Sequence, residues 1–396
     1  MGVVEKLRNK RILIWGYGRE GKSTEDFLNR CCEPASVDIF EGKREEINED
    51  AYDYIFKSPG IPMDEDNPKY TSQTEVFLEE HSSRVIGITG TKGKSTTSSM
   101  IYHVLKNTYS GQVILLGNIG EPCLNSFDKV DDSTIVVFEM SCHQLAHLSV
   151  SPHIAVFLNL YEEHLDYYKT FDKYFAAKKN ITLNQTSEDI FIVGEQVPDF
   201  DTKARRIVVG SENVPDYELK VLGEHNKYNA DVAVKIASEL IGVDKDAAIE
   251  ALKSFEGLPH RLQFVGSVDG VLYYDDSIST IPGATIQALE SVPCARTVLI
   301  GGMDRGIDYE ELVSYIKENP QFNYICAYES GLRIYNEVSD FENCVYRDDL
   351  AGAVTLAKEI TPAGEAVILS PASASYGYFK NFEHRGEVFK ELVGVQ

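Results

Sequence analysis

Short apolar runs alternate with amphipathic segments along the whole chain, and the first such run is Arg11–Trp15. Its five residues are typical of a buried strand, and the glycine-rich stretch Gly16–Gly21 follows directly. A helix is expected near Lys22–Arg30, and further strands are expected at Val37–Glu41 and Tyr54–Phe56. This order of strand, glycine turn, helix and strand predicts a βαβ unit with parallel strands.

A second alternation begins at residue 84 and predicts a larger α/β segment. The strand-like run Arg84–Ile88 leads into a glycine-rich loop, and a helix is expected from Thr97 to about Lys106. Further strands are predicted at Ser133–Phe138, Ile154–Leu160 and Asp189–Val193, and further helices at Phe171–Leu183, Asn226–Ile241 and Ala247–Phe255. The tripeptide Gly257-Leu258-Pro259 then interrupts the pattern and is interpreted as a hinge.

The last third of the chain alternates most regularly. Strands are predicted at Val271–Tyr274, Thr297–Ile300, Tyr324–Ala327, Cys344–Tyr346 and Ala366–Leu369, and helices at Ala284–Ser291, Tyr309–Lys317, Arg333–Glu337 and Leu350–Glu359. This alternation predicts a parallel, doubly wound sheet, whose ligands bind beyond the carboxyl ends of its strands. The fold class is therefore α/β, with domains predicted at residues 1–81, 82–257 and 258–396.

Composition narrows the classes of partner. The chain has 396 residues, too many for one typical core, and its formal net charge of −24 argues against nucleic acid as a ligand. No apolar run is long enough for a membrane span, and the first residues lack the features of a signal peptide. Seven scattered cysteines without a Cys-x-x-Cys pair favour free thiols in a cytoplasmic protein.

The loop Gly90–Ser95 carries the clearest chemical signal. Its glycines, Gly90 and Gly93, let backbone N–H groups approach phosphate oxygens, and the N-terminus of the following helix favours the same anion. Lys94 can reach the outer phosphates of a nucleotide, and Ser95 or Thr96 can bind Mg²⁺. The usual first glycine of a phosphate-binding loop is replaced by Ile88, yet strand, loop, lysine and hydroxyl occur in the expected order. We therefore expect nucleotide binding here.

The earlier turn Gly16–Gly21 has the pattern G-x-G-x-x-G, and Glu41 follows about 20 residues later. This pattern is typical of dinucleotide-binding folds, but alone it is weak. Three interpretations stay open: another kind of nucleotide, a dinucleotide cofactor such as NAD, and a purely structural turn. The second would make the chain an NAD-dependent oxidoreductase, which would leave the Lys94 loop unexplained.

Two side chains near predicted strand ends are candidates for the same site. Glu139 follows the apolar strand that ends at Phe138, and a carboxylate beside a phosphate-binding loop is a natural Mg²⁺ ligand. His164 lies just past another buried strand and is expected at the same sheet edge. Lys178 lies on a predicted helix, where a lysine is ordinarily a solvated cation.

Several segments together resemble the Mur ligases, the ATP-dependent amino-acid ligases of peptidoglycan and cell-wall synthesis. The resemblance covers nearly the whole chain and rests on Thr89–Thr96, Gly117–Gly120, Glu139–Ser141, His164, His225–Asn229 and Pro259–Arg261. The glutamate-adding branch of the family is the most similar, through Ser58–Ile61, Gly257–Arg261, Ser370–Ser375 and Phe379–Gly386. The resemblance implies a Rossmann-like first domain that binds a UDP-linked substrate, a central P-loop ATPase domain, and a Rossmann-like last domain that binds glutamate.

The resemblance further implies ligation of glutamate, with the D-isomer favoured over the L-isomer, to UDP-N-acetylmuramoyl-L-alanine. ATP would phosphorylate the L-alanyl carboxylate, and the glutamate amine would attack the resulting acyl phosphate. The implied cofactors are ATP, two Mg²⁺ ions and a carbamylated lysine at Lys178. The residues implied in catalysis are Lys94, His164, Lys178 and Arg261.

The same resemblance assigns binding residues to each ligand. ATP would be bound by Gly90, Thr91, Lys92, Gly93, Lys94, Ser95, Thr96, Asn229, Arg261 and Asp276. Mg²⁺ would be bound by Ser95, Thr96, Glu139, His164 and Lys178. The UDP-linked substrate would be bound by Gly16, Tyr17, Gly18, Arg19, Glu20, Gly21, Ser58, Asn118, Ser141, Gln144 and His164. Glutamate would be bound by Arg305, Ser375 and Phe382.

Three positions depart from the family pattern. Ile278 stands where the glutamate-adding branch has a lysine, Arg305 replaces a second lysine, and Glu163 replaces an aspartate before His164. A guanidinium binds a carboxylate as a planar fork, whereas an ammonium acts as a point charge. L-glutamate therefore stays an alternative substrate. Another ligase of the superfamily, similar to folylpolyglutamate synthetase, is the second alternative, and a monomer is the expected state.

Overall fold

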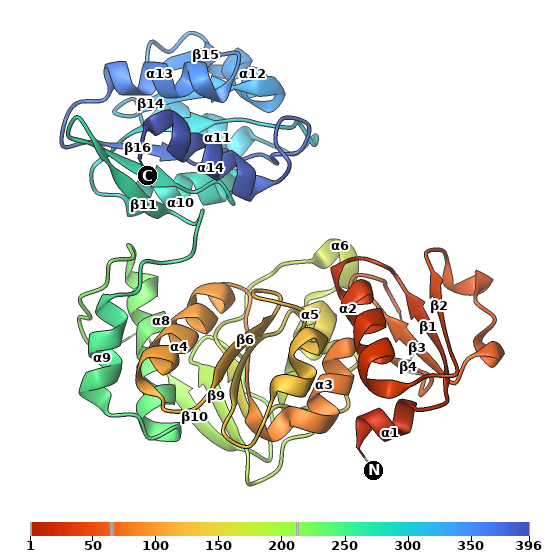
Figure 1. Ribbon diagram of the computed structural model, residues 1–396. Helices are drawn as coiled ribbons and strands as arrows, with labels where there is room; N and C mark the ends of the chain where they lie inside the picture. Colours follow the sequence, from red (N-terminus) through yellow and green to blue (C-terminus); the bar gives the residue numbers. More distant parts are fainter. Residues whose placement is uncertain (1, 64–66, 211, 213, 396) are drawn as a thin grey trace. The chain divides into compact units, whose positions relative to one another are not determined.

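The computed structural model describes residues 2–63, 67–210, 212 and 214–395, and these form three separate sheets flanked by helices (Figure 1). Contacts divide the chain into two compact units. Unit 1 comprises Met1–Glu218 and His225–Phe255, and unit 2 comprises Leu219–Glu224 and Glu256–Gln396. Unit 1 contains two of the sheets and unit 2 contains the third. The three-part division at residues 81 and 257 stays a prediction.

The first sheet is parallel and has the order β2-β1-β3-β4. Its strands are β1 (Arg11–Trp15), β2 (Ser36–Phe40), β3 (Tyr54–Lys57) and β4 (Tyr70–Thr71). Helix α2 (Arg19–Phe27) begins within the glycine-rich stretch, with Gly18 as its N-cap, so the predicted βαβ unit is confirmed. Sequence patterning missed the two-residue β4.

The second sheet is also parallel, with the order β10-β9-β8-β5-β7-β6. Its strands are β5 (Val85–Thr89), β6 (Val113–Gly117), β7 (Ile135–Glu139), β8 (Ile154–Phe157), β9 (Ile190–Gly194) and β10 (Arg205–Val209). The phosphate-loop strand β5 therefore lies in the sheet interior, between β8 and β7. Its neighbours were predicted, whereas the edge strands β6 and β10 were not.

Most of the longer helices of unit 1 lie on predicted segments, but the helix at Gln73–His81 was not predicted. The longer ones are α3 (Gln73–His81), α4 (Lys94–Thr108), α7 (Phe171–Leu183), α8 (Glu224–Lys235) and α9 (Lys245–Lys253). Shorter ones are α1 (Val3–Leu7), α5 (Cys142–Leu145) and α6 (Leu165–Tyr168), with single 3-10 turns or π-helical stretches at Leu28–Cys32, Arg44–Glu46, Glu49–Ala51, Ser82–Arg84, Cys123–Lys129 and Ile236–Leu240.

One apolar core joins the two sheets of unit 1. The ring of Phe27 on α2 lies 4.7 Å from that of Phe127, and Phe77 on α3 lies 5.8 Å from Phe138 on β7 (centroid distances). Each of these rings is buried. Burial of such aromatic side chains is the main favourable contribution to folding, so the first sheet is held against the second by its own helices.

The third sheet is mixed, and the prediction of a purely parallel sheet is wrong at one edge. Its order is β11-β12-β16-β13-β14-β15, and β11 pairs antiparallel with β12. The strands are β11 (Gln263–Val268), β12 (Val271–Asp275), β13 (Ala295–Ile300), β14 (Asn323–Ala327), β15 (Cys344–Arg347) and β16 (Ala366–Leu369). Only Asp269 and Gly270 connect β11 to β12, both with positive φ. A two-residue turn of this kind joins antiparallel strands.

The helices around the third sheet are α10 (Pro282–Ser291), α11 (Glu310–Glu318), α12 (Tyr328–Val338), α13 (Leu350–Ile360) and α14 (Phe382–Val393). The first four were predicted, and α14 was missed. Among the described residues, no helix combines the length and the apolar character that crossing a bilayer requires.

Gly21 allows α2 to approach the turn before it, which generates a stability prediction. A Cβ at Gly21 would lie 2.3 Å from the carbonyl oxygen of Gly16, whereas one at Gly18 would meet no heavy atom within 4 Å. We expect Gly21→Ala to lower the free energy of unfolding by about 1–3 kcal/mol through this overlap. Gly18→Ala, the matched control, should lose only about 0.5 kcal/mol at the start of the helix. Urea unfolding compares the two; equal losses would contradict the steric argument.

Candidate active site

The loop after β5 has the geometry of a phosphate-binding loop. Strand β5 ends at Thr89, and α4 begins at Lys94 with Gly93 as its N-cap. Gly93 has φ +81°, a conformation that side chains with a Cβ rarely adopt. The N-terminus of α4 favours an anion at this place. Within the loop, the N–H groups of Thr91 and Lys92 donate to Asn159. Ser95 and Thr96 lie half-buried in the first turn of α4.

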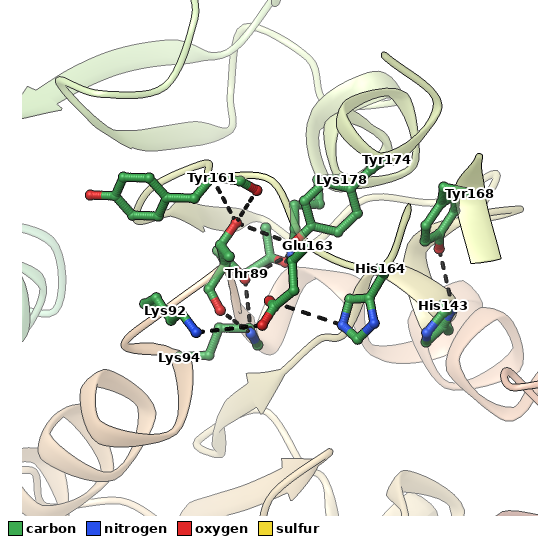
Figure 2. A network of polar contacts seen from close by, with 12 residues as sticks. Thr89, Lys92, Lys94, His143, Tyr161, Glu163, His164, Tyr168, Tyr174 and Lys178 are labelled. Carbon is green, nitrogen blue, oxygen red and sulfur yellow. Dashed lines mark hydrogen bonds and ion pairs between the residues drawn. The ribbon is translucent and has the colours of Figure 1, made fainter. Parts of the chain in front are cut away.

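Two lysines converge on this loop (Figure 2). Lys94 Nζ donates to the carbonyl oxygens of Gly90 (2.9 Å) and Thr91 (3.0 Å). Lys178 Nζ, from α7, donates to the same Gly90 oxygen (2.7 Å) and lies 3.4 Å from the Thr89 hydroxyl. The Lys178 side chain is 1% exposed and lies over the ring of Tyr174.

Burial is the main influence on both lysines. It lowers the pKa of Lys94, and it lowers the pKa of Lys178 to about 7, with the positive charge of Lys94 acting in the same direction. Near neutral pH a substantial fraction of Lys178 is therefore an uncharged amine. The sequence could not indicate this, because an isolated helical lysine is ordinarily solvated.

Glu139 ends β7, which is paired directly with β5, and its side chain is completely buried. Asn118 Nδ2 donates to Glu139 Oε1 (2.8 Å), whereas Oε2 has no hydrogen-bond partner among the described residues. A buried carboxylate oxygen without a donor is uncommon and suits a cation. Together with the hydroxyls of Ser95 and Thr96, it supplies the oxygen donors that Mg²⁺ prefers, so the residues fit that ion.

His164 is exposed and has φ +56°, an uncommon conformation for this residue type. Its Nε2 lies 4.0 Å from Glu163 Oε2, and Glu163 Oε1 lies 3.5 Å from Lys92 Nζ. Glu163 thus lies between the loop and the histidine (Figure 2).

Sequence reasoning missed two residues that hold the loop. The Asn159 side chain pairs with the Lys92 backbone, accepting from N (2.8 Å) and donating to O (3.0 Å). The Tyr174 hydroxyl lies 3.1 Å from Thr91 Oγ1, which also accepts from the backbone N of Tyr161 (3.0 Å). The sequence could have indicated Asn159, because this polar residue follows the apolar strand β8, and that strand pairs with β5.

The structure brings the predicted Asn229 to the start of α4. Asn229 Oδ1 accepts from Thr97 Oγ1 (3.1 Å), and Asn229 Nδ2 donates to Asn226 Oδ1 (3.1 Å). A Cβ added at Gly93 would lie 3.0 Å from Asn229 Oδ1. Asn229, which the resemblance implies in ATP binding, therefore lies beside the phosphate loop.

Some of the residues predicted for the UDP-linked substrate contact one another. Ser58 Oγ donates to the Gly16 carbonyl oxygen (2.9 Å), which places the loop after β3 beside the glycine turn. Gln144 Nε2 donates to Glu20 Oε1 (3.0 Å), and burial raises the pKa of Glu20. Ser141 begins α5 in a capping box with Gln144.

Two further residues predicted for this substrate, and one residue that was not predicted, make contacts nearby. Tyr17 donates to Glu25, and Arg19 donates to the carbonyl oxygen of Gly120. Lys57, which the sequence did not suggest, donates to the carbonyl oxygens of Ser58 (3.2 Å) and Ile61 (2.7 Å). Burial lowers the pKa of Lys57 to about 8.

In unit 2, Asp276 lies directly after β12 and is buried. It accepts from the hydroxyls of Ser279 (2.6 Å) and Ser370 (2.7 Å) and from the backbone N of Leu262 (3.0 Å). Burial nevertheless raises the pKa of Asp276 to about 6. Arg261, predicted for catalysis, is exposed.

A buried hydrogen-bonded pair that sequence reasoning missed lies next to Asp276. His260 Nδ1 lies 2.6 Å from Asp275 Oδ2, and both side chains are almost completely buried. His260 was quoted within a motif but received no role. The pair holds the chain just before Arg261 against the end of β12.

The residues predicted for glutamate have different surroundings. Arg305 is exposed on the loop after β13 and makes no ion pair with any described residue, whereas Ser375 is buried. Phe382 is the first residue of α14, and its carbonyl oxygen accepts from Ser277 Oγ (2.8 Å). Arg385, which was missed, is 1% exposed and donates to the carbonyl oxygens of Ser277 (2.7 Å) and Ser373 (3.0 Å).

Comparison with known proteins shows the family of the chain. The profile of the Mur ligase middle domain matches residues 88–209, which include the phosphate loop, Glu139, His164 and Lys178. The chain is 32% identical to UDP-N-acetylmuramoylalanine–D-glutamate ligase of Aquifex aeolicus, over 97% of this chain and 99% of the relative. It is 31% identical to UDP-N-acetylmuramoyl-L-alanine–L-glutamate ligase of Salinispora tropica, over 98% of each.

The chain belongs to the Mur ligase family. Solved structures of the family share its fold: MurF of Thermotoga maritima with ADP gives a TM-score of 0.61 at 18% identity, covering 98% of this chain and 95% of that one. MurC of the same organism gives 0.62 at 18% identity, covering 96% and 98%. The predicted three-domain Mur ligase architecture and the prediction of an ATP-dependent amino-acid ligase are confirmed.

The buried amine of Lys178 generates a prediction about pH. Its pKa is about 7 in the folded protein and ordinarily 10.5, so between these values the unfolded chain binds a proton that the folded Mur ligase does not. This residue's contribution therefore makes stability rise as pH increases from 7 to 9. Lys178→Met should remove that rise, measured as urea midpoints in CO₂-free buffer.

The matched control is Lys179→Met on the same helix. In the wild type, the ammonium group of Lys179 lies over the ring of Phe175. The difference in midpoint between wild type and Lys178→Met should grow with pH, and that for Lys179→Met should not. If both differences change alike, the interpretation of Lys178 as a group that folding deprotonates is wrong.

Proposed function

We propose that this Mur ligase adds glutamate to UDP-N-acetylmuramoyl-L-alanine at the expense of ATP. The observation that carries the proposal is the convergence of Lys94 and Lys178 on Gly90, beside a buried Glu139 with an unpartnered oxygen. Relatives that align over almost the full chain carry names for this reaction. A nucleotide-linked substrate also agrees with a cytoplasmic enzyme, and a monomer is our proposal for its state.

The reaction must activate a carboxylate, which is a poor electrophile. Transfer of the γ-phosphoryl group of ATP to the L-alanyl carboxylate forms an acyl phosphate and ADP. Attack by the glutamate amine then forms the amide, releasing phosphate and a proton. Lys94 stabilises the negative charge that develops on the transferred phosphoryl group, and the loop N–H groups fix its position.

Mg²⁺ would be held by Glu139, by the hydroxyls of Ser95 and Thr96, and by His164; we propose two ions. When bound, such ions neutralise phosphate charge. The role of the protein residues is orientation: Asn118 fixes one oxygen of Glu139, and the other oxygen is left for the cation.

We further propose that Lys178 is carbamylated. An uncharged amine is required for a bond to form between Nζ and the carbon of CO₂, with release of one proton. The pKa of about 7 supports the proposal, because the amine is then partly uncharged at neutral pH. The carbamate would replace a cation near Glu139 with an anion, and so would provide Mg²⁺ with a further ligand.

The glycine turn after β1 is proposed to bind the uridine diphosphate of the substrate, within a domain spanning residues 1–81. Its N–H groups and the start of α2 favour a pyrophosphate. The contact between Glu20 and Gln144 supports this role, since it connects the turn to the segment that contains Ser141. Family membership leaves the oxidoreductase alternative without support.

The ATP loop lies in the proposed central domain, residues 82–257, and glutamate is assigned to residues 258–396. Arg261 and Asp276 are proposed nucleotide contacts. For the amino acid we propose Arg305, Ser375 and Phe382. D-glutamate is the proposed isomer; L-glutamate is the second candidate, because the similar Salinispora tropica relative is named for it.

The first prediction for this function concerns the isomer. Purified enzyme with ATP, Mg²⁺ and UDP-N-acetylmuramoyl-L-alanine should release phosphate when D-glutamate is added. L-glutamate should give at least about tenfold less, because a misplaced amine loses the benefit of orientation. Phosphate release is measured continuously, and the product is identified by mass spectrometry.

Lys94→Ala serves as the control for contaminating ATPase and should show only background release. Phosphate release with L-glutamate alone would support the proposed mechanism but show that the substrate is the L-isomer. Release with neither isomer, from folded wild-type protein, would refute the proposed function.

The second prediction concerns Arg305. Because it is exposed and makes no ion pair with any described residue, its guanidinium is available for a carboxylate. Arg305→Ala should raise the KM for glutamate by about tenfold or more, the loss expected for a charge-assisted hydrogen bond, with the KM for ATP unchanged. Arg305→Lys should be intermediate. Lys317→Ala, an exposed cation on α11, is the control; an unchanged KM for glutamate in Arg305→Ala would remove this residue from the pocket.

A further inference from the structure

Three metal-ligating side chains of different chemistry meet beside the proposed active site. Cys142 and His143 are the first residues of α5, and His164 immediately precedes α6. One ligand atom from each of the three lies within 4.8 Å of the others. The two imidazole rings are neighbours, with centroids 5.2 Å apart (Figure 2). Only His164 has a role in the proposed reaction.

The donor set differs in kind from that of the Mg²⁺ site. A thiolate and two imidazoles suit Zn²⁺ and similar transition metals, whereas Mg²⁺ prefers carboxylate, hydroxyl and water oxygens. Ligand atoms of a tetrahedral zinc site are about 3.6 Å apart. Side-chain rotations that shorten the distances between the three ligand atoms by about 1 Å would therefore let all three bind one ion. The fourth position of the tetrahedron would stay open.

The surrounding residues restrict the orientation of these side chains. The ring of His143 stacks on Tyr168 with an interplanar angle of 9°, and the Tyr168 hydroxyl lies 3.3 Å from His143 Nδ1. A partner at one ring nitrogen is typical of metal-binding histidines. Cys142 is buried and lies within the capping box formed by Ser141 and Gln144. These two side chains therefore lose less conformational entropy when a metal binds than flexible surface side chains would.

One carboxylate and a free thiol lie at the cluster. Glu163 Oε2 lies 4.0 Å from His164 Nε2. Cys142 is a free thiol and can provide a thiolate without breaking a disulfide. Binding would release the thiol proton to solvent, which balances the charge of the step.

We propose that Cys142, His143 and His164 form a binding site for a zinc-type transition-metal ion, and that occupancy of this site inhibits the ligase. The inhibition follows because the metal would occupy the His164 imidazole, which the ligation reaction needs. This second part rests on the proposed function, whereas metal binding does not. The chain would thus lose activity when free zinc rises.

Cobalt(II) is the probe for binding, because a cobalt–thiolate bond adds a near-ultraviolet charge-transfer band that oxygen and nitrogen ligands do not give. Titration of full-length, reduced protein in the presence of excess Mg²⁺ should produce this band with one equivalent of cobalt. Zn²⁺ should abolish it, because zinc displaces cobalt at thiolate–imidazole sites.

Variants identify the ligands. Cys142→Ser should eliminate the band, and His143→Phe, which keeps a ring for stacking, should weaken cobalt binding by at least about tenfold. His143→Gln is a second variant should the ring alter folding. Cys294→Ser, a half-buried cysteine of unit 2, is the control and should bind as wild type. Absence of the band in wild type, or its persistence in Cys142→Ser, would overturn the site.

Activity tests the consequence. Stoichiometric Zn²⁺ in excess Mg²⁺ should reduce phosphate release by wild type at least about tenfold, and Cys142→Ser should retain its activity. A cobalt band with no inhibition by zinc would overturn the coupling to His164. If wild type without zinc released no phosphate, the proposed function would fail, while the spectroscopic result would still decide the metal site.

Discussion

The carbonyl oxygen of Gly90 accepts hydrogen bonds from two lysine ammonium groups, and the arrangement of the unit 1 site depends on this shared acceptor. Lys94 comes from the helix after the loop and Lys178 from a helix more than 80 residues later. Two like charges in a buried place repel each other, which is one reason why the pKa of Lys178 falls to about 7. The loop thereby gathers two basic side chains in a protein whose formal net charge is −24. A polyphosphate would relieve this repulsion.

Parallel pairing explains why residues so distant in sequence meet at this loop. Strand β5 lies between β8 and β7, with Ile88 opposite Glu139 and Thr89 opposite Phe157. All three strands end at the same edge, so their following residues converge there. The same logic operates in unit 2, where Asp275 pairs with Leu369 and the next residues, Asp276 and Ser370, form a hydrogen bond. The sheets thus place polar side chains over apolar cores, and Cys142 and His143 follow β7 at the same edge.

How far the fold could be predicted depended on how local the determining interactions are. Helix α7 has the predicted bounds, because Thr170 caps its first turn and its apolar positions recur at helical spacing. Helix α14 was missed because its buried face includes Arg385 and Gly386, which break the apolar pattern. The antiparallel edge strand β11 was missed although Asp269-Gly270 is a recognisable turn. Apolar periodicity alone does not give the direction in which a strand pairs.

The sequence by itself determined the order of strand, glycine loop, lysine and helix, and with it the class of chemistry, because those requirements lie within a dozen neighbouring residues. Tertiary structure alone decided that Lys178 is an amine of lowered pKa, that Glu139 keeps one oxygen unpartnered, and that Asn229 reaches Gly93. It also decided that Cys142, His143 and His164 come together. Protonation state and metal affinity depend on burial and on distances between atoms of separate elements, and these quantities exist only once the sheets have paired and packed.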